Sequence, residues 1–144
     1  MSVILGFLRV SRLTVCTRND TLLLMAFQSN EKIITVRFFK TPAGNEPVRD
    51  WLKKQTAEAK KAIGEDIKAV EFLWPLGYPQ VTKLDKDLWE IRTNLTDSIC
   101  RVFFTVTAGF MVLLHGIIKK DQKTPKQDLD LAKKRRDSIL SGGL

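Results

Sequence analysis

The side chains best suited to chemistry in this sequence are cations near the ends of predicted strands. Arg92 and Arg101 stand on either side of a predicted turn, and Lys119, Lys120 and Lys123 follow an apolar run. Guanidinium groups bind phosphate oxygens in bidentate fashion, and ammonium groups stabilise negative charge that develops during a reaction. Cleavage of RNA needs such cations, a base for the 2′-hydroxyl and an acid for the leaving oxygen. The pattern therefore indicates a phosphodiester as a candidate substrate.

Two arrangements of the arginines are open. In an antiparallel hairpin Arg92 and Arg101 can lie side by side, and like charges in that position repel unless an anion neutralises them. The anion is either a bound phosphate or an acidic side chain of the protein, for which the candidates are Glu90, Asp97 and Asp121. The first arrangement predicts a phosphate clamp, and the second predicts internal ion pairs.

His115 is the only histidine of the sequence. An imidazole exchanges protons near neutral pH, so His115 could act as a general acid or base. It could equally be a core residue with one hydrogen-bonded nitrogen, because it lies within the apolar run from 112 to 118. A single histidine, without any familiar catalytic motif, argues against a Ser-His-Asp triad or a histidine metal site. No cofactor is indicated.

Composition limits the class of protein and its partners. The chain has 144 residues, which suits one domain, and a formal net charge of +8, which favours a polyanion such as RNA or DNA. An acidic protein, a membrane surface or a merely solvated basic face would also fit. The two cysteines form neither a disulfide framework nor a zinc motif, and no apolar run is long enough to span a membrane. We therefore expect a soluble cytoplasmic protein.

The first half of the chain predicts a strand followed by two helices. Residues 32–40 are rich in β-branched and aromatic side chains, which is typical of a strand. Asn45 or Glu46 can cap a short helix with Pro47 in its first turn. A second helix is predicted from about Thr56, with apolar residues at helical spacing up to position 73. The two helices are expected to form an antiparallel hairpin that packs on a sheet.

The second half predicts that sheet and a last helix. Four strands are expected at residues 81–84, 88–94, 99–107 and 110–118, joined by short turns into an antiparallel meander. Thr124 is predicted to cap the last helix, with Pro125 in its first position and a loose end from position 141. Helices before an antiparallel meander predict an α+β fold.

Residues 1–24 fit the rest of the chain poorly. Apolar blocks at both ends bracket a polar stretch, and the arginines follow the first block, whereas a secretory signal would have them before it. The segment is either an extension that packs loosely on the domain or translated sequence ahead of a true start at Met25, and the second is slightly favoured. The predicted domain is 25–144.

Several motifs, taken in this order, resemble a known family. They are Leu88-Trp89-Glu90-Ile91-Arg92, Arg101-Val102-Phe103-Phe104, the stretch from Leu113-Leu114-His115-Gly116 through Lys119-Lys120 to Thr124-Pro125, and a last helix with Ala132 and Arg135 or Arg136. From about residue 33 to residue 140 the chain resembles the phage-derived Gp49-like, HigB-type toxins of the RelE/ParE superfamily. Where the family usually has Phe, this sequence has Ile117 or Ile118.

The resemblance implies both a fold and an activity. The fold would be RelE/ParE-like, with an N-terminal helical hairpin packed on a mainly antiparallel sheet and a C-terminal helix. The activity would be that of a type II toxin, a metal-independent endoribonuclease that cleaves mRNA in the ribosomal A site and is neutralised by a helix-turn-helix antitoxin. Arg92 and Arg101 would bind phosphate, His115, Lys119 and Lys120 would complete the catalytic set, and further RNA contacts would come from Lys83, Lys86, Lys123 and Lys126.

Two rival functions remain open. ParE-like members of the superfamily poison DNA gyrase through protein contacts without cleaving RNA, and a degenerate member would retain antitoxin binding alone. The ribonuclease hypothesis predicts that Arg92→Ala and Arg101→Ala each abolish toxicity and leave the fold intact. The oligomeric state is not indicated.

Overall fold

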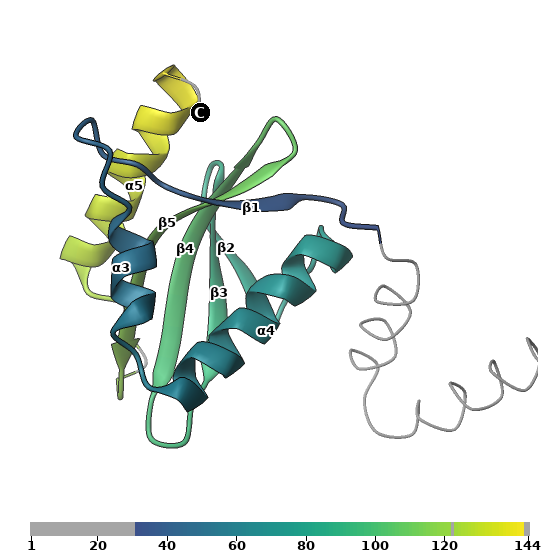
Figure 1. The fold of residues 1–144 in the computed structure, drawn as a ribbon, viewed down its shortest axis with the longest axis vertical. Helices are drawn as coiled ribbons and strands as arrows, with labels where there is room; N and C mark the ends of the chain where they lie inside the picture. The colour runs from purple at the N-terminus through teal and green to yellow at the C-terminus, as the bar shows by residue number, and fades with distance from the viewer. Residues whose placement is uncertain (1–30, 122, 143–144) are drawn as a thin grey trace, which may run out of the picture.

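A five-stranded sheet organises the computed structural model, which describes residues 31–121 and 123–142 (Figure 1). The strand order is β1-β5-β4-β3-β2, with β1 parallel to β5 and all other neighbours antiparallel. The α+β prediction is confirmed, with a sheet that is mixed because of β1. The strands are β1 (Thr35–Phe38), β2 (Val81–Asp85), β3 (Leu88–Asn94), β4 (Ile99–Thr107) and β5 (Phe110–Lys119).

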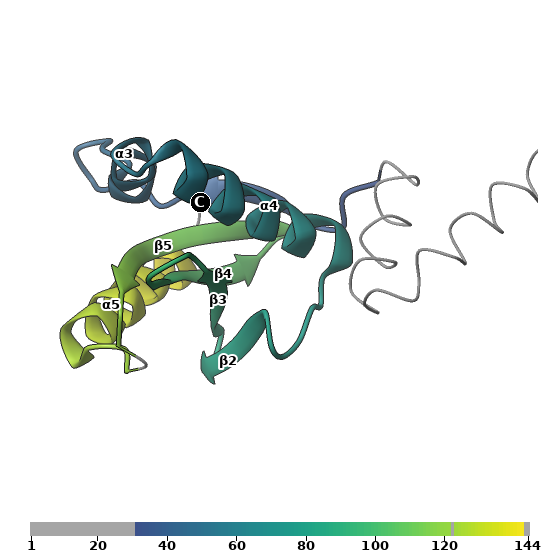
Figure 2. The ribbon, with the colours of Figure 1, turned by 90° about the horizontal axis from the view of Figure 1, so that it is seen from below.

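The helices cover both faces of this sheet (Figure 2). On one face lie α3 (Pro47–Lys53) and α4 (Ala57–Leu73), and on the other lies α5 (Lys126–Gly142). With helices on both sides, β4 and β5 are buried on both faces, which explains their nearly continuous apolar sequences. The predicted boundaries of the four meander strands agree with the structure to within one residue.

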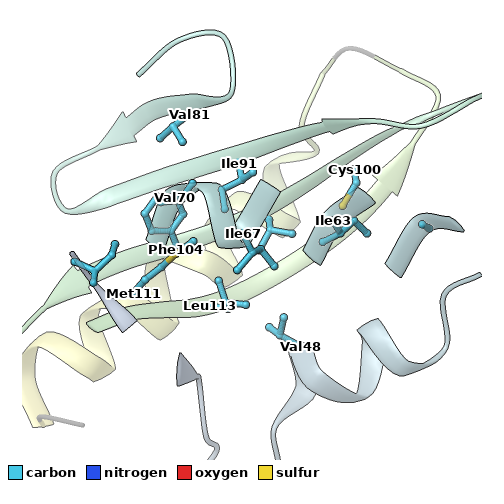
Figure 3. Packing of buried hydrophobic residues seen from close by; sticks show 13 residues of the cluster. Val48, Ile63, Ile67, Val70, Val81, Ile91, Cys100, Phe104, Met111 and Leu113 are labelled. Atoms are coloured by element: carbon cyan, nitrogen blue, oxygen red, sulfur yellow. The ribbon is translucent and has the colours of Figure 1, made fainter. Parts of the chain in front are cut away.

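The larger core lies between the sheet and the helices α3 and α4. Figure 3 shows α4 side chains, such as Ile63, Ile67 and Val70, packed against strand residues that include Phe104 and Leu113. The predicted start of α4 is confirmed, because the Thr56 side-chain oxygen accepts a hydrogen bond of 3.2 Å from an amide in the first turn. Burial of this stripe fixes α4 on β3 and β1.

α3 begins as predicted, but its cap differs. Glu46 occupies the capping position without a side-chain capping bond, and its carboxylate accepts instead from Arg49 at 3.0 Å. α3 packs closely on β5 because Gly116 has no side chain: a Cβ there would lie 2.3 Å from the Trp51 ring. The glycine in the middle of β5 is thus explained by the close approach of a helix.

Strand β1 is shorter than the predicted 32–40, and a buried glutamate secures it. The carboxylate of Glu71, in the last turns of α4, accepts from the Val36 amide at 2.9 Å and pairs with Lys32 at 2.7 Å. The Glu71 carbonyl accepts from the amides of Ile33 and Ile34, so the chain before Thr35 bonds to α4. Because these amides bond to α4 and not to a neighbouring strand, β1 begins only at Thr35.

A bulge interrupts the pairing of β4 with β5. Phe103 pairs with His115 and Phe104 pairs with Leu113, so Leu114 is the extra residue. As a result Leu114 and His115 both lie on the α5 side, where Leu114 joins the smaller core and His115 contacts α5. Without the bulge, strict alternation would turn His115 toward α3.

The last helix differs from its prediction at both ends. It begins at Lys126 and continues through Gly142, beyond the loose end expected from position 141. The sequence predicts Thr124 as its cap, but the Thr124 hydroxyl lies 3.5 Å from a carboxylate oxygen of Glu90, which draws it toward the sheet. Predictions for residues 1–24 and for a start at Met25 fall outside the described residues. In the part of the chain that the structure describes, no helix could cross a membrane.

Candidate functional site

The two arginines predicted to act together lie directly opposite each other on β3 and β4. Arg101 is buried, with 4% of its side chain exposed, and its Nη1 donates to Oε1 of Glu90 at 2.7 Å. Arg92 is 32% exposed, and its Nη2 lies 3.8 Å from the same oxygen. Glu90 itself is buried. Of the two arrangements left open by the sequence, pairing with Glu90 is the one observed.

This pairing gives the two arginines an internal counter-ion, and phosphate binding by them stays a prediction. Glu90 and Arg92 are two residues apart on β3, so their side chains lie on one face of the sheet. Arg101 pairs with Arg92 on the neighbouring strand and lies on the same face. Two guanidinium groups at one cross-strand pair require a counter-ion, and Glu90 supplies it from within the protein. Arg101 therefore does not offer its guanidinium to solvent in this structure. Arg92 does, and its Nε atom is buried without a hydrogen-bond partner among the described residues.

His115 is held by a carboxylate that sequence reasoning missed. Its Nε2 lies 2.7 Å from Oδ1 of Asp128 in the first turn of α5, and its ring stacks on Phe103 with centroids 6.1 Å apart. Because a carboxylate accepts, this contact places the ring hydrogen on Nε2 and leaves Nδ1 as the basic nitrogen. The arrangement is chemically able to take up a proton.

The histidine and the arginines share one face of the sheet. Phe103 and Arg101 are two residues apart on β4, and His115 pairs with Phe103. Diagonal neighbours on one sheet face lie roughly 7–8 Å apart, within reach of long side chains and a bound phosphate. α5 covers the part of this face beyond His115, where Ala132 and Ile139 are buried.

The lysines divide into two groups. Lys119 pairs with Ile99 at the end of β5 nearest Arg101, and Lys120, Lys123 and Lys126 follow it as exposed residues around the β5–α5 loop. These four form what we call the lysine rim: Lys119, Lys120, Lys123 and Lys126. The rim borders the site.

Lys83 and Lys86 lie elsewhere. Lys83 pairs with Trp89 and places its ammonium group 5.7 Å from that ring, and Lys86 is in the β2–β3 turn. This turn is at the opposite end of β3 from Arg92, so the structure does not bring Lys83 and Lys86 into the site.

Two arginines of α5, Arg135 and Arg136, attach this helix to the sheet. The sequence indicates them only through the family resemblance. Arg135 donates to the Leu114 carbonyl at 2.7 Å, beside the bulge, and Arg136 donates to Asp85 at 2.9 Å. The Arg136 hydrogen bond holds the pKa of Asp85 at about 2, below its ordinary value. Burial lowers the pKa of Arg135. These bonds attach to the sheet the helix that carries Asp128.

Comparison with known proteins agrees with the resemblance read from the motifs. The family model described as phage-derived protein Gp49-like matches residues 50–137, more than half of the chain, and the match includes Glu90, Arg92, Arg101, His115 and Asp128. Among curated proteins none matches. The chain belongs to the phage-derived Gp49-like family, which is a family of RelE/HigB-type toxins.

Proposed function

We propose that this chain is the toxin of a type II toxin–antitoxin pair and that it cleaves mRNA on the ribosome. The observation that carries the proposal is the set of groups on one sheet face: a partly exposed guanidinium at Arg92, an imidazole oriented by Asp128, and the lysine rim beside them. Family membership supports a toxin with a cognate antitoxin. The fold would be the RelE/ParE-like one, and the antitoxin a helix-turn-helix protein.

The chemistry would be an in-line attack within the RNA itself. Nδ1 of His115 takes the proton of the 2′-hydroxyl, and the 2′-oxygen forms a bond to phosphorus. The bond from phosphorus to the 5′-oxygen breaks, and the leaving oxygen takes a proton from the lysine rim. The products are a 2′,3′-cyclic phosphate and a free 5′-hydroxyl. The reaction so written uses no metal ion.

The cations would act on the charge that develops at phosphorus. Arg92 would donate to a nonbridging oxygen of the scissile phosphate, and the partial exposure of its side chain beside Glu90 supports this role. The rim would neutralise the neighbouring phosphates and hold the strand on the ribosome. Arg101, which is buried, would act through Glu90 and Arg92 without touching RNA.

Expression in growing cells separates this function from its rivals. We expect growth arrest, with primer extension showing discrete cleavages in the reading frame of translated messages. Growth arrest with intact messages and an SOS response would identify a ParE-like gyrase inhibitor in place of a ribonuclease. Unimpaired growth, with the protein present and folded, would leave only an antitoxin-binding module.

A further inference from the structure

We propose that Glu90 is a positioning residue of this site, whose buried carboxylate holds Arg92 in the orientation that binds the scissile phosphate. The inference rests on the proposed ribonuclease function and adds a residue for which the sequence suggested only an ion pair. It also explains why a carboxylate, normally repelled by RNA, lies at the centre of a cationic site.

One oxygen of Glu90 is shared by both arginines. Oε1 is 2.7 Å from Nη1 of Arg101 and 3.8 Å from Nη2 of Arg92, and only 2% of the Glu90 side chain is exposed. A buried carboxylate must be paired, and the buried Arg101 pairs with it directly. The longer contact leaves Arg92 attracted to Glu90 but still able to donate elsewhere.

The second oxygen of Glu90 faces the β5–α5 loop. Oε2 is 3.5 Å from the Thr124 hydroxyl, at the outer limit of a hydrogen bond, and Thr124 directly follows Lys123. One carboxylate therefore contacts β4, its own strand neighbour Arg92, and the loop that carries part of the lysine rim. Glu90 therefore lies between the Arg92 guanidinium and the loop that carries part of the lysine rim.

Arg92 has few other contacts that could orient it. Its Nε is buried and has no hydrogen-bond partner among the described residues, and its one ion pair in that part of the chain is with Glu90. A long side chain without such a partner samples many rotamers, and an orientation lost in this way slows a reaction by roughly 100-fold. Glu90 is thus the group that prevents this loss.

The decisive comparison is between two buried glutamates. Glu90→Gln removes the charge and keeps the size, and Glu71→Gln does the same at a carboxylate that is also buried and also paired with a cation, on the far side of the sheet. Both variants should lose stability, measured as Tm. Cleavage of mRNA in purified ribosome complexes should lose roughly 100-fold in kcat for Glu90→Gln, with KM little changed, and should be unaffected in Glu71→Gln.

A substitution that keeps the charge at position 90 gives a second test of the positioning role. Glu90→Asp keeps the charge on a shorter side chain and should recover part of the kcat lost in Glu90→Gln. If Glu90→Gln cleaves as fast as Glu71→Gln at matched folded fraction, Glu90 only neutralises Arg101 and the proposal is overturned.

Orientation can also be followed without any cleavage assay. In NMR spectra of the arginine side chains, the buried Nε–H of Arg92 should give a sharp, slowly exchanging signal in the wild type and in Glu71→Gln. In Glu90→Gln it should broaden or exchange quickly. An unchanged Arg92 signal in Glu90→Gln would refute the positioning role whatever the activity. A wild type that never cleaves mRNA would instead refute the proposed function, and the Arg92 signal would still show whether Glu90 orients that side chain.

Discussion

At the scale of single residues, the two arginines that look equivalent in the sequence have different surroundings. Arg92 is 32% exposed and Arg101 is 4% exposed, and both depend on one glutamate. In the proposed site Arg92 binds RNA, whereas Arg101 supports Glu90 within the protein. Substitutions at the two positions should therefore differ in what they damage.

We expect Arg92→Ala to abolish toxicity without unfolding the protein. Losing one guanidinium that stabilises transition-state charge costs about 100-fold to 1,000-fold in rate, and the Arg101–Glu90 pair remains intact. The check is the cleavage rate on ribosomes together with Tm. Arg49→Ala is the matched control, because it removes an arginine that is 56% exposed on α3. Equal activity of Arg92→Ala and Arg49→Ala would exclude Arg92 from the site.

Arg101→Ala should lower stability as well as activity, unlike the expectation from the sequence that it leaves the fold intact. The substitution leaves Glu90 buried beside a more distant arginine, and breaking a buried ion pair costs about 3–5 kcal/mol. Denaturant unfolding measures this loss. A free energy of unfolding equal to that of the wild type would show that Arg101 is not the partner on which Glu90 depends.

The pair of His115 and Asp128 gives the test of the proposed base. Asp128→Asn keeps the shape of the side chain but removes the charge that orients the imidazole, so cleavage should slow by about 100-fold or more. Asp130→Asn, at an exposed position in the same helix turn, should cleave at the wild-type rate. A fast Asp128→Asn variant would mean that another group takes the proton.

At the scale of elements, the strands and helices were largely predictable because hydrophobic periodicity and turn residues are local signals. The ladder from β2 to β5 and the Thr56 cap of α4 follow from such signals. The bulge at Leu114 does not, because it depends on how β5 fits β4 and α5, and it decides which face His115 occupies. For the same reason Asp128 and the role of Glu90 could not be recognised before the layers were known.

Gly116 is the place where element packing is most sensitive. Gly116→Ala would put a Cβ 2.3 Å from the Trp51 ring and should destabilise the protein by about 1–3 kcal/mol as α3 is pushed from β5. Gly64→Ala, in α4 with no atom near the added Cβ, should stabilise it by about 1 kcal/mol. Chemical denaturation measures the free energy of unfolding of both variants, which should fall for Gly116→Ala and rise for Gly64→Ala. A neutral Gly116→Ala would show that α3 does not pack as described.

The anchoring of α5 should depend on pH through Asp85. Hydrogen bonding to Arg136 lowers the pKa of Asp85 to about 2, below the ordinary value of 3.8, so the ionised form stabilises the folded state above about pH 4. That contribution is lost as the pH falls through 2. Between pH 4 and pH 2 the Tm of the wild type should therefore fall more steeply than that of Asp85→Asn. Parallel curves would show that the Asp85–Arg136 bond adds no stability.

At the scale of the whole molecule, four of the cations that contribute to the formal charge of +8 lie in the lysine rim. The lysine rim gathers cations beside Arg92 on one side of the sheet, whereas Lys53, Lys60 and Lys61 are exposed on the helices of the other side. Each phosphate contact contributes roughly 0.7 to the salt slope of binding to single strands. Changing Lys119, Lys120 and Lys123 to Gln should thus reduce the slope for ribosome-bound mRNA by about 2, and the same changes at Lys53, Lys60 and Lys61 should leave it unaltered.

The measurement that tests the central claim most directly is mapping of RNA ends in a reconstituted translation system. Purified protein is added to one message with and without ribosomes, and Arg92→Ala is run beside it. We predict discrete cuts in the reading frame, each ending in a 2′,3′-cyclic phosphate, that require ribosomes and disappear with Arg92→Ala. Full-length message in every lane would contradict the assignment of this sheet face as a ribonuclease site, provided that the same wild-type protein is folded and arrests growth when expressed in cells.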